Sequence, residues 1–307
     1  MSDGAGRSSI SAALEHIGAT AGTAPRAPGG AAAGDEPVDD PPELDPAWYD
    51  AIAVRRSRRR FSDRKVAAAA LEALTGFTQR FRLAPGARVE LTQGGGDVFT
   101  GLLDRLGGAY GRVEGAPWTA AFIGPKGSEL QVGYVGEAFV LEATRLGLGT
   151  CWVAGMFDRK TAASLVKLHR GEHVVAVTPV GHPVEHKRVV ERMMSTAVRS
   201  AARRQVEAIA PQLMRTSGHG HPAWPAWAVT AVEAARLAPS GANKQPWRFS
   251  MEHDALVMGQ ADRTYWTAPI DLGIAMLHVE LGAAREGVRG AWERLDEPLV
   301  ARFVPGG

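Results

Sequence analysis

Apolar residues recur at helical spacing in several separate stretches of this 307-residue chain. The spacing predicts helices over 47–55, 67–81, 131–146, 160–168, 197–210, 225–236 and 271–286. Alternating or continuous runs of apolar and β-branched residues predict strands over 88–92, 119–124, 173–181 and 246–258. Because these elements follow one another without a regular strand–helix–strand rhythm, the pattern predicts an α+β fold and not a doubly wound parallel sheet.

A second pattern repeats along the chain. Residues 131–152 align with residues 271–292 without gaps at an offset of 140. Gly133 matches Gly273 near one end of the alignment, and Trp152 matches Trp292 at the other. The match predicts a tandem duplication in which two halves, 46–192 and 193–307, pack as an intramolecular pseudo-dimer.

Composition narrows the class of protein. Residues 1–45 are rich in Gly, Ala, Pro and Ser, which predicts a disordered tail. A formal charge of +2 gives no general preference for nucleic acid. We find no apolar run long enough for a membrane helix and no signal-peptide pattern, so we expect a cytoplasmic protein without membrane contact. The single cysteine, Cys151, excludes an internal disulfide.

The stretch APSGANKQPWRF, residues 238–249, carries more polar side chains than a helix-to-strand connection needs. The alternatives are a polar turn that closes on itself at Pro246 and a loop that holds a ligand. An arginine-rich stretch, RRSRRRF at 55–61, raises a similar question. It is either a solvated basic face or a site for a dianion such as a phosphate.

Together with GLGTCW at 147–152 and VTPVGHP at 177–183, these two stretches resemble the FMN-dependent nitroreductase superfamily. The order of the motifs is similar to a branch of that superfamily with two fused half-repeats. Only the first half carries the arginine stretch, and only the second carries the polar loop. The resemblance therefore implies one FMN site between the halves, in a chain that needs no second copy, although further association stays open.

The resemblance implies a set of cofactor-binding residues. The FMN phosphate would lie against the arginine stretch, while Arg58 and Arg60, which alternate with the expected ligands, would face solvent. The loop would line the flavin, and backbone N–H groups at residues 154–155 would meet its ring edge. Related proteins often carry a carboxylate where this chain has Ala154. The expected ligands are Arg55, Arg56, Ser57, Arg59, Ala154, Gly155, Lys187, Arg188, Pro239, Ser240, Gly241 and Asn243.

The implied activity is electron transfer from NAD(P)H, through FMN, to a small electron-poor acceptor such as a nitroaromatic or a quinone. The chemistry would occur at flavin N5, so no catalytic side chain is expected. We expect Cys151 to be a small buried residue and not a nucleophile. His219 and His221 lie in a linker without nearby carboxylates, so no metal site is expected, and no phosphate-loop or Rossmann motif is present.

Two other classes of protein stay open. One is a degenerate flavin-binding protein without nicotinamide turnover, which Ala154 and the unequal halves would favour. The other is an interaction module without flavin, which the Gly/Ala/Pro-rich tail and the arginine stretch would favour.

Overall fold

The computed structural model describes residues 44–83, 86–99, 113–184, 202–215, 224–261 and 266–306. The predicted tail, apart from its last two residues, lies outside these ranges. So do Lys187, Arg188, His219 and His221, together with the start of the helix predicted over 197–210.

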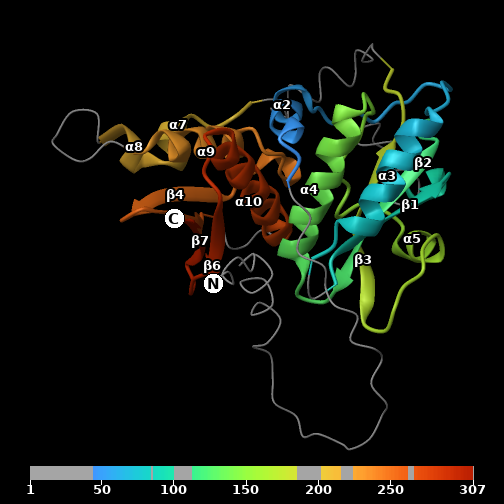
Figure 1. The fold of residues 1–307 in the computed structure, drawn as a ribbon. Helices are drawn as coiled ribbons and strands as arrows, with labels where there is room; N and C mark the ends of the chain where they lie inside the picture. The colour runs from blue at the N-terminus through green and yellow to red at the C-terminus, as the bar shows by residue number, and fades with distance from the viewer. Residues whose placement is uncertain are drawn as a thin grey trace, which may run out of the picture.

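Two antiparallel sheets stand on either side of a central pair of long helices (Figure 1). The first sheet has the order β1–β2–β3 and the second the order β4–β5–β7–β6. The strands of the first sheet are β1 (Arg88–Gln93), β2 (Trp118–Pro125) and β3 (Glu172–Val180). The strands of the second sheet are β4 (Trp247–Glu252), β5 (Ala255–Gln260), β6 (Gly290–Arg294) and β7 (Leu299–Pro305). The α+β prediction is confirmed.

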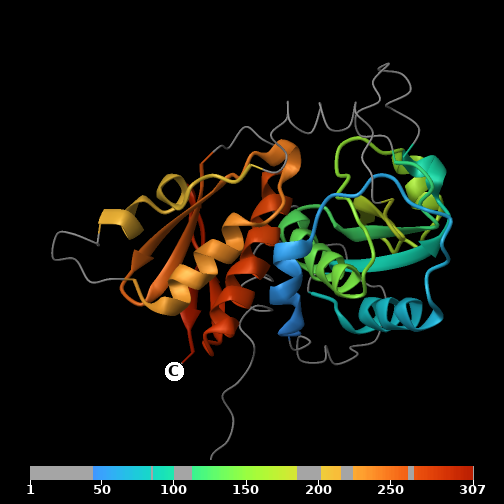
Figure 2. The same ribbon diagram turned by 90° about the horizontal axis from the view of Figure 1, so that it is seen from above.

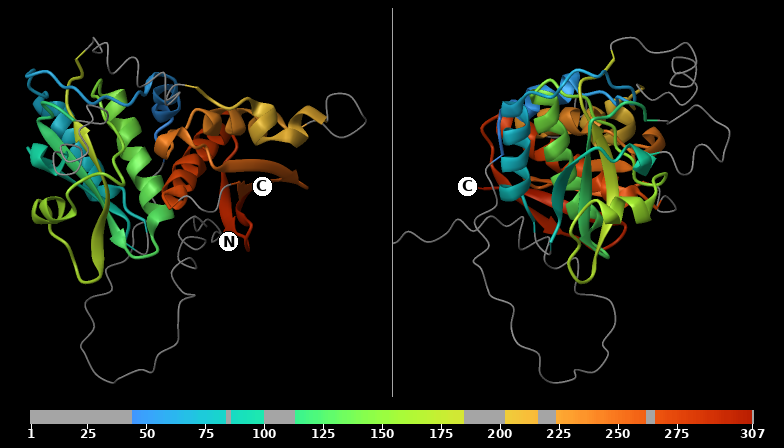
Figure 3. Two further views of the ribbon diagram at one scale, coloured as in Figure 1. Left: turned by 180° about the vertical axis from the view of Figure 1, so that it is seen from behind. Right: turned by 90° about the vertical axis from the view of Figure 1, so that its right-hand side faces the viewer.

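The central helices are α4 (Glu129–Arg145) and α10 (Ala268–Arg285), which lie side by side in every view (Figures 2 and 3). In the first half, α3 (Ala68–Arg80) packs against α4 and β1, and α5 (Arg159–Ser164) packs against β3. In the second half, α9 (Ala226–Arg236) packs along α10. Short helices α7 (Val206–Ile209) and α8 (Pro211–Arg215) cover β4, while α2 (Ala47–Val54) contacts both α4 and α10.

Most predicted elements are confirmed to within a few residues, but two expectations were wrong and two strands were missed. The strand predicted over 246–258 is a hairpin, because the chain turns at His253, whose φ is 55°. Residues 202–205 are not helical, so the described part of the helix predicted over 197–210 is limited to α7. Strands β6 and β7 follow α10 and complete the second sheet, where no strand was predicted.

Helix α4 is apolar on nearly all sides because it is covered on all sides. Every residue from Leu130 to Ala143 is buried between the first sheet, α2, α3 and α10. Helix α10 is buried in the same way from Ile270 to Ala283. An all-round apolar helix of this length is typical of an interior helix. None of the described helices is long and apolar enough to cross a membrane.

The two glycines of the sequence repeat lie at the crossing of α4 and α10. A methyl group on Gly133 would collide with the carbonyl oxygen of Ile270, and one on Gly273 would collide with the carbonyl oxygen of Leu130. Both the glycines (133 and 273) and the carbonyls (130 and 270) are 140 positions apart, so the two contacts are reciprocal. Glycine is required here because backbone meets backbone.

We expect Gly133→Ala and Gly273→Ala each to lower thermal stability, because either methyl group must force the central helices apart. Overpacking of this kind costs about 1–3 kcal/mol, and a rigid backbone neighbour favours the upper end. Thermal denaturation followed by circular dichroism would measure the loss. Gly96→Ala is the control, since a methyl group there meets nothing within 4 Å. Variants at 133 and 273 that melt with wild-type protein would contradict the close crossing.

Candidate functional site

Three of the sequence motifs meet in the first half through backbone contacts. Ser57 pairs with Thr150 as an isolated parallel bridge, and the Arg58 N–H donates to the Thr150 carbonyl at 2.7 Å. The Val184 N–H donates to the Arg60 carbonyl at 3.0 Å. The arginine stretch therefore runs alongside both the GLGTCW segment and the end of β3.

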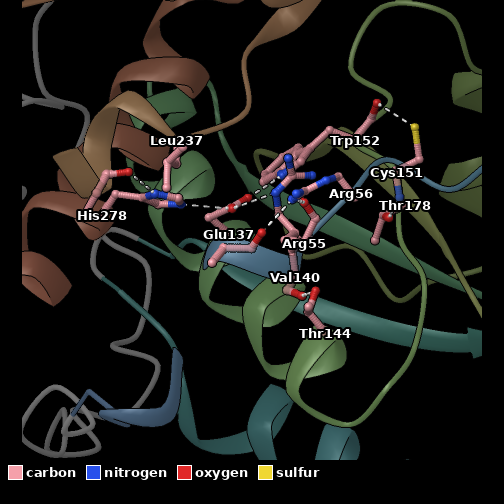
Figure 4. Close-up of polar contacts among 12 residues, drawn as sticks. Arg55, Arg56, Glu137, Val140, Thr144, Cys151, Trp152, Thr178, Leu237 and His278 are labelled. Atoms are coloured by element: carbon pink, nitrogen blue, oxygen red, sulfur yellow. Dashed lines mark hydrogen bonds and ion pairs between the residues drawn. The ribbon is translucent and has the colours of Figure 1, made fainter. Parts of the chain in front are cut away.

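Arg55 is the buried member of the arginine stretch. Its side chain is 6% exposed, and its Nε lies 3.9 Å from Oε1 of Glu137 on α4 (Figure 4). That buried Nε has no hydrogen-bond partner among the described residues. Burial lowers the pKa of Arg55, although Glu137 opposes the shift. Neighbouring Arg56 is exposed and donates to the carbonyls of Ala53 and Arg55 at 2.8 and 2.7 Å.

Glu137 is fully buried and joins the two halves. Its Oε1 lies 3.1 Å from Nε2 of His278 on α10, and its Oε2 accepts from Nε1 of Trp152 at 2.7 Å (Figure 4). Nδ1 of His278 lies 2.8 Å from the Ala234 carbonyl. Neither Glu137 nor His278 was expected from the sequence.

The polar loop at 238–249 has an unusual backbone, which accounts for several of its polar residues. Three of its residues, Ala242, Asn243 and Gln245, have φ values of 46°, 56° and 50°. Its polar groups are used to hold this left-handed backbone. Ser240 Oγ accepts from the Gln245 N–H at 2.9 Å, and the Gly241 N–H donates to both carboxylate oxygens of Asp271 at 3.0 and 3.1 Å.

Asn243, an expected flavin ligand, is engaged with the segment that precedes α7. Its Nδ2 donates to the Ala202 carbonyl at 2.7 Å, and its Oδ1 accepts from Nη1 of Arg203 at 3.1 Å. Gln245 Nε2 donates to the same Oδ1 at 3.2 Å, and Gln245 Oε1 accepts from the Arg204 N–H at 2.8 Å. A flavin contact from Asn243 would therefore require exchange of these internal bonds. Pro239 is buried beside the loop.

Residues 154–155 lie at the border of the site, where Ala154 is half-buried and Gly155 is exposed. The Trp266 ring of the second half covers Gly155, where an added methyl group would lie 2.8 Å from the ring. Trp266 is 60% exposed and Met156 is 39% exposed, so two large apolar side chains face solvent at this border. The Ala154 carbonyl accepts from Arg159 at 3.4 Å. Sequence reasoning did not single out Trp266.

Other expectations for the arginine stretch were only partly correct. Ser57 is exposed and Arg59 is half-buried, so both side chains are at least partly accessible to solvent. Arg58 and Arg60 were expected to face solvent, but both are half-buried. Nε of Arg60 lies 3.5 Å from Glu114, and the Arg58 side chain packs on Gly149. These contacts hold the segment against its neighbours.

Cys151 is buried, as expected, and its N–H donates to the Thr178 hydroxyl at 2.9 Å (Figure 4). Within the described residues, no three His, Cys, Asp or Glu side chains gather into a possible metal site.

Residues 47–283 match the family model described as "Putative TM nitroreductase". The chain belongs to this family.

One solved structure supports the same fold over most of the chain, and two others are similar to part of it. A protein from Thermotoga maritima described as a putative nitroreductase superposes with a TM-score of 0.55 at 19% identity, covering 88% of this chain and 99% of its own. An FMN-dependent nitroreductase from Clostridium difficile is 20% identical, with a TM-score of 0.36 over 45% of this chain and 88% of its own. A nitroreductase with bound FMN from Bacteroides fragilis is 18% identical, with a TM-score of 0.34 over 46% and 91%. No curated protein matches the chain.

We expect the variant Glu137→Gln to be strongly destabilised. The amide preserves size and can still face Trp152 and His278, but Arg55 becomes a buried cation without its carboxylate. Removing one partner of a buried pair costs about 3–5 kcal/mol. Chemical denaturation would measure this loss. Glu129→Gln at the start of the same helix is the control, and an equal effect in both variants would contradict the importance of the Arg55–Glu137 contact.

The stability conferred by Asp271 should depend on pH. Burial raises its pKa from 3.8 to about 8, although the Gly241 N–H bond opposes the shift. The folded state therefore favours the protonated acid, and stability falls as pH rises from about 4 to about 8. Asp271→Asn can still accept from Gly241 but cannot ionise. The melting temperature of this variant, relative to wild type, should rise from about pH 5 to about pH 9.

Exposed Asp254, in the turn between β4 and β5, provides the control for this measurement. Asp254→Asn should differ from wild type by a constant amount across the same range. A difference for Asp271→Asn that stays flat with pH would show that Asp271 is ionised in the folded protein at all these values.

Proposed function

We propose that this chain is an FMN-dependent oxidoreductase that takes electrons from NAD(P)H and passes them to a small electron-poor acceptor, such as a nitroaromatic or a quinone. The observation that carries the proposal is the buried Nε of Arg55, which lacks a hydrogen-bond partner among the described residues and lies beside exposed Arg56. A guanidinium donor left unsatisfied in the interior is costly unless a ligand completes it. A phosphate monoester offers charge and acceptor oxygens suited to such donors.

The residues present fit the cofactor in three respects. Arg55, Arg56 and Ser57 would hold the phosphate, together with half-buried Arg59. The backbone at Ala154 and Gly155 would meet the ring edge, which the Trp266 ring of the other half would help to shield from water. When bound, FMN would supply reversible two-electron transfer, and the chain would supply binding, orientation and the electrostatic environment.

We also propose that the two halves form an intramolecular pseudo-dimer with a single site between them. The reciprocal contacts of Gly133 and Gly273 support this arrangement, since a two-fold operator produces paired contacts of that kind. The arginine stretch comes from the first half, while the polar loop and Trp266 come from the second. Each half alone would lack part of the site.

Two features bear on the alternative, a flavin-binding protein without nicotinamide turnover. Ala154 provides no carboxylate at the ring edge. The Asn243 amide is engaged with Ala202 and Arg203 and would have to exchange partners to contact a ligand.

Purified protein should retain FMN through desalting after incubation with the cofactor, and the flavin absorbance should bleach under anaerobic NADH or NADPH. Adding a quinone or a nitroaromatic should then restore it. Arg56→Gln should weaken FMN retention by about tenfold, because it removes a charge-assisted contact to phosphate. Arg82→Gln removes an exposed arginine outside the stretch and should retain FMN as wild type does.

Wild-type protein that retains no FMN would contradict the cofactor assignment. Retained FMN that neither nicotinamide reduces would instead favour the alternative. Equal retention by Arg56→Gln and Arg82→Gln would remove Arg56 from the phosphate site while leaving the cofactor in place.

A further inference from the structure

Asp271 lies in the first turn of α10 and ties the polar loop to that helix. Both of its carboxyl oxygens accept from the Gly241 N–H, at 3.0 and 3.1 Å. Asp271 is 3% exposed, so this bond is made away from water. The Asp271 N–H donates to the Thr267 carbonyl at 3.1 Å, within the same turn of helix. The loop is therefore held from a buried point of α10.

The same turn of α10 also touches the first half. Ile270, next to Asp271, presents its carbonyl oxygen to Gly133 on α4, where an added methyl group would collide with it. Because backbone meets backbone there, the crossing of the central helices leaves the first turn of α10 little freedom. The crossing therefore positions Asp271, and Asp271 positions the loop relative to the half that carries the arginine stretch.

The backbone of the loop requires such an anchor. Ala242, Asn243 and Gln245 have φ values of 46°, 56° and 50°, in the left-handed region that residues with a side chain adopt only at a cost. Conformations of this kind persist where surrounding contacts hold them. The bond from Gly241 to Asp271 enters the loop directly before the first of these residues. Loss of the acceptor would remove that support.

Ser240, the neighbour of Gly241, is the hydroxyl whose position this bond helps to set. Its Oγ accepts from the Gln245 N–H at 2.9 Å. A hydroxyl that accepts a bond still has its own proton to donate. Ser240 is half-buried, so its side chain is partly open to solvent. With Gly241 held by Asp271 and the Ser240 oxygen held by Gln245, this donor has a defined position at the surface of the loop.

We infer that Asp271 is a positioning residue of the flavin site, which holds Gly241 and so keeps the loop in the conformation that presents Ser240 to the flavin ring. The inference rests on the proposed function for the identity of the ligand. The loop would meet the ring and not the phosphate. Loss of the Asp271 acceptor should therefore weaken FMN and riboflavin, which carries the same ring without the phosphate, by the same factor. Asparagine should substitute for Asp271, because its amide oxygen can still accept from Gly241.

The test measures FMN and riboflavin affinity by flavin fluorescence quenching in full-length wild-type protein, Asp271→Leu, Asp271→Asn and Glu280→Leu. Asp271→Leu should weaken both flavins by about tenfold, and Asp271→Asn should stay within about threefold of wild type. Glu280→Leu is the matched control. Glu280 is also a buried acid on α10 whose pKa burial raises to about 8, but its partner is Tyr134 and not the loop. Both affinities of Glu280→Leu should stay within about threefold of wild type.

A second readout needs no flavin. Amide hydrogen exchange of residues 241–245 reports how often the bonds of the loop open. In ligand-free Asp271→Leu these amides should exchange about tenfold faster than in wild type. In Asp271→Asn and Glu280→Leu they should exchange as in wild type. If Asp271→Leu does not fold, Asp271→Ala removes the same acceptor and takes its place in both measurements.

The outcomes separate this inference from the proposed function. If loss of the Asp271 acceptor weakens the flavins no more than Glu280→Leu does, weakens FMN alone, or leaves loop exchange unchanged, the inference is wrong while the flavin assignment stands. If wild type binds neither flavin but loss of the acceptor opens the loop, Asp271 positions the loop and the flavin assignment is wrong. Wild type that binds no flavin, with a loop that does not respond to Asp271, overturns both.

Discussion

The structure depends on the close crossing of α4 and α10. Gly133 and Gly273 let each helix approach the backbone of the other, so side chains further along the helices meet across the boundary between the halves. Tyr134 donates to Glu280 at 3.0 Å, and Glu137 contacts His278 at 3.1 Å, each pair with one residue on α4 and one on α10. A larger residue at the crossing would separate both pairs. The geometry of the candidate site therefore depends on the backbone contact between α4 and α10.

The boundary between the halves is polar as well as closely packed. Burial raises the pKa of Glu280 to about 8, against the effect of the Tyr134 hydrogen bond, and raises that of Asp271 to a similar value. An apolar boundary would avoid this cost of burying acids. Buried polar pairs can, however, specify one alignment of two helices among several that apolar side chains would tolerate. In this chain the buried polar pairs lie between α4 and α10, near the arginine stretch and the polar loop. A shift of one helix along the other would move these two motifs apart.

Much of the fold could be predicted because it depends on local pattern. Residues 131–146 and 271–286 are apolar because these helices are buried on all sides. Gly133 and Gly273 repeat because each lies where α4 and α10 cross. The turn at His253 could not be predicted, because MEHD contains no Gly or Asn, the residues that most readily adopt a left-handed backbone. Strand β6 lies at the edge of its sheet and ends in Glu293 and Arg294, and these charges hide its strand pattern.

The site was less predictable, because its long-range partners have no signal in the sequence. The loop at 238–249 was correctly identified as unusual, but its polar residues are explained first by bonds to Asp271, Ala202 and Arg203. Arg203 lies in SAARRQVEAIA, which has the composition of an ordinary helix surface, and only the folded chain brings it to Asn243 of the polar loop. A motif identifies the residues that a family uses for binding. The residues that a particular chain adds to that set can be recognised only from charge and burial in the folded state.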